Sequence, residues 1–288
     1  MPVFNNIKRS CLALAISQTI TLSAQAAVIN VTNNGDDSIG CTLREAIRSA
    51  NSDFSIGNCT AGDGADIITF NGIPDDSTIT LTQGQLFVTS EITVNGLGQD
   101  RLTINGNNAS RVFYVDAFNY GLFGRFAGEL TLNDITISGG SLAPNTGLNG
   151  AGIMALGRDA KVSINNATVS GNTANRGGGI SFSGSSLTLN NSTVSSNSAF
   201  FGGGGIHLTS TTSSTTISNS SISGNYGYEG GGIHSYNSNI DIVSSTISGN
   251  SAGRGGGVYS EGSNANIINS TIIRKFIYRP IRNRWRFV

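Results

Sequence analysis

Alternating apolar and polar positions run through the chain from about residue 130 to residue 273. Residues 186–189 (SLTL) and 239–242 (NIDI) place every second side chain on one face. A period of two is typical of half-buried β-strands, whereas an amphipathic helix has a period of 3.6. The pattern therefore predicts many short strands, and the 39 glycines of the chain favour tight turns between them.

The strands belong to a sequence repeat. Each of four copies has Val or Ile, two small residues and Asn, and a Gly-Gly-Gly segment ending in Ile or Val follows. The asparagines recur at intervals of 25, 28 and 25 residues; they are Asn172, Asn197, Asn225 and Asn250. The apolar residues after the glycines are Ile180, Ile206, Ile233 and Val258. A period near 25 without a helix excludes leucine-rich, ankyrin and tetratricopeptide solenoids and predicts one β-helix coil per repeat.

Stacked coils would place equivalent residues about 4.8 Å apart. We therefore expect the four asparagines to form a hydrogen-bonded ladder at a turn and the four apolar residues to face inward. The glycine triplets are interpreted as turns with positive φ or close stacking, because no strand-to-helix context of a nucleotide loop surrounds them. The predicted fold is all-β, a right-handed parallel β-helix over residues 67–273.

A short helix is expected before the repeats. Apolar residues at helical spacing run from Leu43 to Ala50, and Thr42 and Glu45 predict a capping box at the start. A helix with one apolar side can cover the open first coil, whose strand edges would otherwise be unpaired. We therefore predict an N-terminal capping helix.

This region also carries a family resemblance. Residues 41–47 (CTLREAI) and 62–70 (GDGADIITF) resemble the CSLREA domain, which opens many exported bacterial β-helix proteins. The resemblance covers roughly residues 28–70 and implies a structural cap, which we place at residues 27–70. Thr42 replaces the serine of that domain and keeps its hydroxyl. Asp63 and Asp66 are interpreted as turn residues, with calcium binding as the alternative; the alternating acids of a calcium loop are missing.

The repeats themselves resemble those of polymorphic outer-membrane proteins, which are adhesin-like exported passengers often tethered by a C-terminal barrel. That family more often has phenylalanine at the first repeat position, which here is Val169, Val194, Ile222 and Ile247. The resemblance implies surface display and adhesion, with outer-membrane association through a C-terminal region.

The first 26 residues have the layout of a cleaved secretory signal. Lys8 and Arg9 precede the apolar residues 11–16, and Ala24 and Ala26 form a small-residue cleavage site. The apolar run is too short for a membrane span. We expect export to the extracellular space or the outer-membrane surface, with Ala27 as the first residue of the mature chain.

Export changes the interpretation of the cysteines. Loss of Cys11 with the signal leaves Cys41 and Cys59 in an oxidising compartment. We predict a disulfide between them, with two free thiols as the alternative.

Charge is unevenly distributed along the chain. Residues 27–273 carry nine basic and 17 acidic residues, a formal net charge of −8. Such a body lacks the basic surface that nucleic acid requires, so nucleic-acid binding is excluded. The repeat breaks after residue 273, and residues 274–288 are predicted to be an aberrant basic tail produced by truncation or a frameshift, with a basic membrane-binding tail as the alternative.

The predicted strand parity puts Ser181, His207, His234 and Tyr259 in one outward column. Two neighbouring imidazoles would begin a zinc site, but a third protein ligand is needed. We therefore favour a solvated histidine stack and predict no metal ion and no cofactor.

Polysaccharide cleavage would need two facing carboxylates, or a base beside a cation. The charged residues of the repeats do not recur as a cluster; they are Asp134, Arg158, Asp159, Lys161, Arg176, Glu229, Asp241, Arg254 and Glu261. Glu229 and Arg254 are expected to form a surface ion pair. We predict a binding or structural protein without catalytic residues, whose outer faces bind a glycan or another surface. A polysaccharide lyase or glycoside hydrolase is the alternative.

Overall fold

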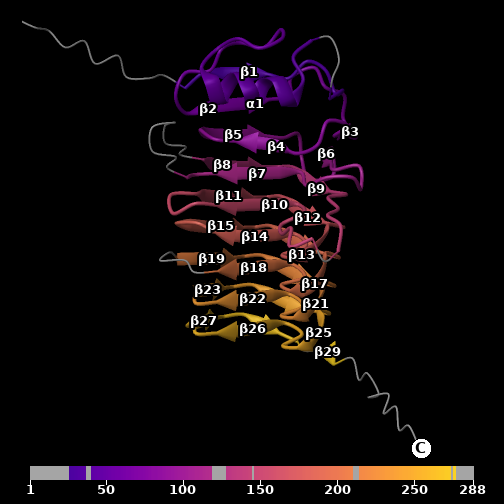
Figure 1. The fold of residues 1–288 in the computed structure, drawn as a ribbon, viewed down its shortest axis with the longest axis vertical. Coiled ribbons are helices and arrows are strands. Elements are labelled where there is room, and N and C mark those ends of the chain that lie inside the picture. The colour runs from indigo at the N-terminus through magenta and orange to yellow at the C-terminus, as the bar shows by residue number, and fades with distance from the viewer. Residues whose placement is uncertain are drawn as a thin grey trace, which may run out of the picture.

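The computed structural model describes residues 26–36, 40–118, 128–144, 146–209, 214–273 and 275–276. They form a parallel β-solenoid of about seven turns with one short helix near the N-terminus. The coils stack along the long axis of the molecule, in chain order (Figure 1). The solenoid predicted from the repeats is therefore confirmed. The predicted signal lies outside the described residues, except for Ala26.

Four sheets run along the stack, and the strand pairs within them are parallel. The nine-stranded sheet contains β1 (Val28–Asn30), β2 (Asp66–Thr69), β5 (Glu91–Asn95), β8 (Glu129–Asn133), β11 (Lys161–Asn165), β15 (Ser186–Asn190), β19 (Ser214–Ser218), β23 (Asn239–Val243) and β27 (Ala265–Ile268). The eight-stranded sheet contains β3 (Ser77–Thr80), β6 (Leu102–Asn105), β9 (Thr136–Ser138), β12 (Thr168–Ser170), β16 (Thr193–Ser195), β20 (Ser221–Ser223), β24 (Thr246–Ser248) and β28 (Thr271–Ile272).

The other two sheets complete each coil. The five-stranded sheet contains β13 (Thr173–Arg176), β17 (Ser198–Gly202), β21 (Tyr226–Glu229), β25 (Ser251–Arg254) and β29 (Lys275–Phe276). The seven-stranded sheet contains β4 (Leu86–Val88), β7 (Phe113–Asp116), β10 (Ile153–Leu156), β14 (Ile180–Ser183), β18 (Ile206–Thr209), β22 (Ile233–Tyr236) and β26 (Val258–Glu261). A coil such as β11 to β14 therefore visits all four sheets before β15 begins the next.

Columns of apolar side chains fill the interior. The predicted inward column is paired in register; it consists of Ile180, Ile206, Ile233 and Val258. Leu86, Phe113 and Ile153 extend it toward the N-terminus. Its members are buried except for Val258, which packs against the core but is only partly covered. Burial of each such side chain stabilises the fold by about 1.5–3 kcal/mol.

The repeated asparagines form the predicted ladder. In successive coils, Nδ2 of Asn172, Asn197 and Asn225 donates to Oδ1 of the next asparagine at 3.0, 3.0 and 2.9 Å. The glycine triplet makes room for this ladder, since a Cβ on Gly179 would lie 3.0 Å from Nδ2 of Asn197. Gly177, the first glycine of its triplet, has a φ of 58°, which side-chain-bearing residues rarely adopt.

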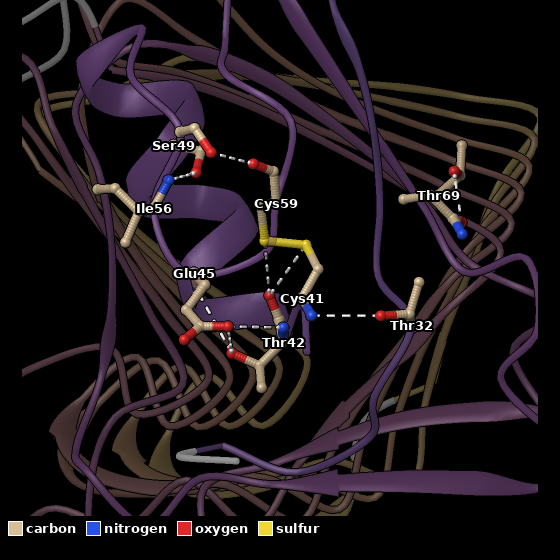
Figure 2. The surroundings of a disulfide bond; sticks show 10 residues. Thr32, Cys41, Thr42, Glu45, Ser49, Ile56, Cys59 and Thr69 are labelled. Atoms are coloured by element: carbon tan, nitrogen blue, oxygen red, sulfur yellow. Dashed lines mark hydrogen bonds between the residues drawn. A yellow bond between two sulfur atoms is a disulfide. The ribbon is translucent and has the colours of Figure 1, made fainter. Parts of the chain in front are cut away.

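The helix α1 (Leu43–Ser52) lies at the N-terminal end of the stack (Figure 1). Its apolar side is buried, and Thr42 and Glu45 form the predicted capping box. The predicted disulfide joins Cys41 to Cys59 beside the start of the helix (Figure 2). The two cysteines are separated by 18 positions in the sequence. In the chain-entropy model, closing a loop of this size stabilises the folded state by about 3 kcal/mol. Among the described residues, no helix is long and apolar enough to cross a membrane.

The paired strands extend slightly past the predicted end of the repeats. β28 pairs with β24 within the predicted repeats, and β29 pairs with β25 beyond them, so the stack reaches residue 276 rather than 273. Backbone pairing needs no particular side chain, which explains why β29 forms although the Ser-Gly-Asn turn before it is absent. The remainder of the predicted tail, residue 274 and residues 277–288, lies outside the described residues.

Candidate functional site

An aromatic groove runs over the outer surface of the five-stranded sheet. Phe200 and Phe201 of β17 and Tyr226 and Tyr228 of β21 line a cavity of about 500 Å³, which Leu142 and Pro144 border. These four aromatic side chains are between 42% and 55% exposed. Large apolar side chains gathered in one exposed groove are typical of a binding surface, whereas single exposed ones are ordinary.

A second cavity, the histidine pocket, adjoins the groove. It measures about 340 Å³ and lies between the ends of the five-stranded and seven-stranded sheets; its lining is Arg176, His207, Thr209, Glu229, His234, Tyr236 and Glu261. The guanidinium carbon of Arg176 lies 5.4 Å from the ring centroid of Phe201. Arg176 therefore links the polar pocket to the aromatic groove.

The two histidines occupy the predicted outward column. Ser181, His207, His234 and Tyr259 pair in register along the seven-stranded sheet. The two imidazole centroids are 5.1 Å apart. However, His207 and His234 are only 5% and 6% exposed, so the expected solvated stack is wrong. The five-stranded sheet covers them: a Cβ on Gly202 would lie 2.3 Å from Nδ1 of His234.

Burial makes both imidazoles unusual hydrogen-bonding groups. Nδ1 of His207 and both nitrogens of His234 are buried without a hydrogen-bond partner among the described residues. Burial lowers the pKa of His207 to about 3, with the charges of His234 and Arg176 acting in the same direction. Burial also lowers the pKa of His234. Both rings are therefore neutral at pH 7, each with one donor and one acceptor nitrogen.

The acids and bases of the repeats are less scattered than the sequence indicates. Arg176, Glu229 and Glu261 come from three coils and line the same pocket. Glu229 also forms the predicted ion pair with Arg254, at 3.0 Å, on a solvent-exposed edge. The expectation that charged residues do not cluster is therefore wrong for this part of the surface.

The side-chain geometry supports neither of the alternative metal sites, zinc at the two histidines or calcium at Asp63 and Asp66. Among the described residues, no three His, Cys, Asp or Glu side chains are placed to hold a metal ion. Asp63 and Asp66 serve a turn instead, since the backbone nitrogen of Asp63 donates to Oδ1 of Asp66 at 2.9 Å.

The aromatic groove is not among the features predicted from the sequence, although the sequence contains a signal for it. Both aromatic pairs fall between the asparagine of a repeat and its glycine triplet, in two neighbouring repeats. Comparison of the whole chain with family models, with curated proteins and with solved structures gives no match. The candidate site therefore rests on its own geometry.

Proposed function

We propose that the protein is an exported, surface-displayed β-solenoid of adhesin-like character that binds a neutral glycan chain without cleaving it. The observation that carries this proposal is the aromatic groove beside the histidine pocket. Aromatic rings offer flat apolar faces to the C–H faces of sugar rings, and the adjoining polar groups can fix their hydroxyls. The aromatic groove would hold the glycan chain, and the histidine pocket would select which sugar is bound.

Charge favours a neutral glycan over an acidic one. The body of the protein carries a formal net charge of −8, and two carboxylates line the pocket. A polyanionic chain would be repelled at long range by this field. Neutral hydroxyls suit the pocket because carboxylates accept, guanidinium donates and neutral imidazole does both.

Export and surface display are supported by sequence features. They are the secretory signal layout of residues 1–26, the resemblance of residues 28–70 to the CSLREA domain, and the resemblance of the repeats to polymorphic outer-membrane proteins. The disulfide is consistent with an oxidising compartment.

Glycan binding is tested by removing one aromatic ring. Tyr228→Ala is expected to weaken binding to neutral glycans about tenfold, which corresponds to about 1.4 kcal/mol for a stacked ring. Affinity is measured by calorimetry after a first screen of neutral and acidic polysaccharides. Phe54→Ala is the matched control, because Phe54 is 73% exposed and lies in the N-terminal cap. Equal affinities for wild type and Tyr228→Ala would show that the aromatic groove does not bind the glycan.

A polysaccharide-cleaving enzyme is the second candidate, favoured by the two carboxylates in the histidine pocket. The same incubations are assayed for new reducing ends and for the absorbance of an unsaturated product. We expect neither to appear above background. Cleavage that disappears in Glu261→Gln would replace the binding proposal with a catalytic one.

A further inference from the structure

The carboxylate of Asp66 is buried at the N-terminal end of the solenoid. Asp66 is 1% exposed, and its Oδ1 accepts hydrogen bonds from the backbone nitrogens of Ala27 at 3.1 Å and Asp63 at 2.9 Å. Its Oδ2 is buried and has no hydrogen-bond partner among the described residues. A buried carboxylate with an unsatisfied oxygen is costly unless a cation lies beside it.

No cation is paired with this carboxylate in the part of the chain that the structure describes. Burial raises the pKa of Asp66, the two backbone hydrogen bonds oppose this effect, and the negative charges of Asp53 and Asp63 add to it. The surroundings therefore disfavour the ionised form of Asp66, and only two amide donors stabilise it. A positive charge at the position of either donor would make the ionised form favourable.

One of the two donors is the nitrogen of Ala27, the residue at which the cleavage-site pattern starts the mature chain. The residue before it, Ala26, is exposed, and the carbonyl of Ala27 accepts from the backbone nitrogen of Ile67 at 2.8 Å. The bond between Ala26 and Ala27 is thus at the surface, while Ala27 itself is fixed against β2.

We propose that cleavage of the Ala26–Ala27 bond turns the Ala27 nitrogen into an α-ammonium group that serves as the counter-ion of Asp66. In this hydrolysis, catalysed by a signal peptidase, the oxygen of water completes the new Ala26 carboxylate, and both protons of that water end on the Ala27 nitrogen, which becomes NH3+. The new cation already lies within hydrogen-bond distance of Oδ1 and has further N–H groups for Oδ2. Export would thereby tighten the first strand onto the stack. The inference depends on the proposed export but not on glycan binding.

The ion pair predicts a distinctive pH dependence. The α-amino group has a pKa of about 7.7–8.0 in an unfolded chain, and a neighbouring carboxylate raises that pKa in the folded chain. A raised folded pKa gives stability that is present below about pH 8 and is lost as the pH rises through the folded value. Asp53 and Asp63 are the other charged residues that face Asp66, and both add negative charge beside it.

The test compares two chains, one beginning at Ala27 and one with a single glycine before Ala27. The added residue moves the ammonium by about 3.8 Å and restores an amide at Ala27. At pH 7, the chain beginning at Ala27 is expected to have a Tm higher by about 5 °C, and the difference should shrink by pH 10. Both chains are also made with Asp66→Asn, in which the difference should vanish. Equal Tm values at pH 7, or a difference that persists in Asp66→Asn, would overturn the proposal.

The site of cleavage is read separately from the exported protein. N-terminal sequencing is expected to begin at Ala27, and another first residue would refute the assignment. Neutral-glycan affinity is measured for both chains and should be equal, because the groove lies several coils away from Ala27. Loss of glycan binding and loss of the Tm difference are therefore distinguishable failures.

Discussion

Replacing Asn197 by alanine is expected to lower the free energy of unfolding by about 3–5 kcal/mol. Asn197 is 1% exposed and stands in the middle of the ladder. Its Oδ1 accepts from the backbone nitrogen and Nδ2 of Asn172, and its Nδ2 donates to the carbonyl of Val169 at 2.9 Å. Truncation leaves a buried nitrogen and a buried carbonyl without these partners, and each such group costs about 1–3 kcal/mol.

The matched control is Asn190→Ala, which removes an exposed asparagine whose side chain contacts the next coil at the surface. This change is expected to cost less than about 0.5 kcal/mol. Urea denaturation gives both values, and hydrogen exchange shows whether the coils on either side of Asn197 open first, as nearest-neighbour coupling in a solenoid predicts. Similar losses for the two variants would mean that the ladder adds nothing beyond surface contacts.

The ladder and the interior columns were predictable because a solenoid applies the same constraint once per coil. The equivalents of Asn197 and Ile206 recur at nearly constant intervals in the sequence. Parallel stacking places residues with this equal spacing in direct contact. The capping box was predictable for a different reason, since Thr42 and Glu45 interact within one turn of a helix.

The candidate site was not predictable by the same reasoning. The five-stranded sheet is irregular: its register shifts between Ala174 and Arg176, so Arg176 pairs with Gly202 of a longer strand. This shift breaks the equal spacing on which the alignment of repeats depends. The column parity placed His207 and His234 correctly, but it carried no information about the neighbouring sheet that covers them.

Replacing Asp36 by alanine is expected to lower the free energy of unfolding by about 3–5 kcal/mol. The reason is that the charge of Arg44 is left without its partner. Asp36 is 5% exposed; its carboxylate accepts from Nε of Arg44 at 2.8 Å and from the backbone nitrogen of Thr82 at 2.6 Å. It thus ties the capping helix to the first coil. Lys161→Ala, which breaks an exposed pair, should cost under about 1 kcal/mol. Urea denaturation measures both losses, and equal small losses would show that apolar packing alone holds the cap.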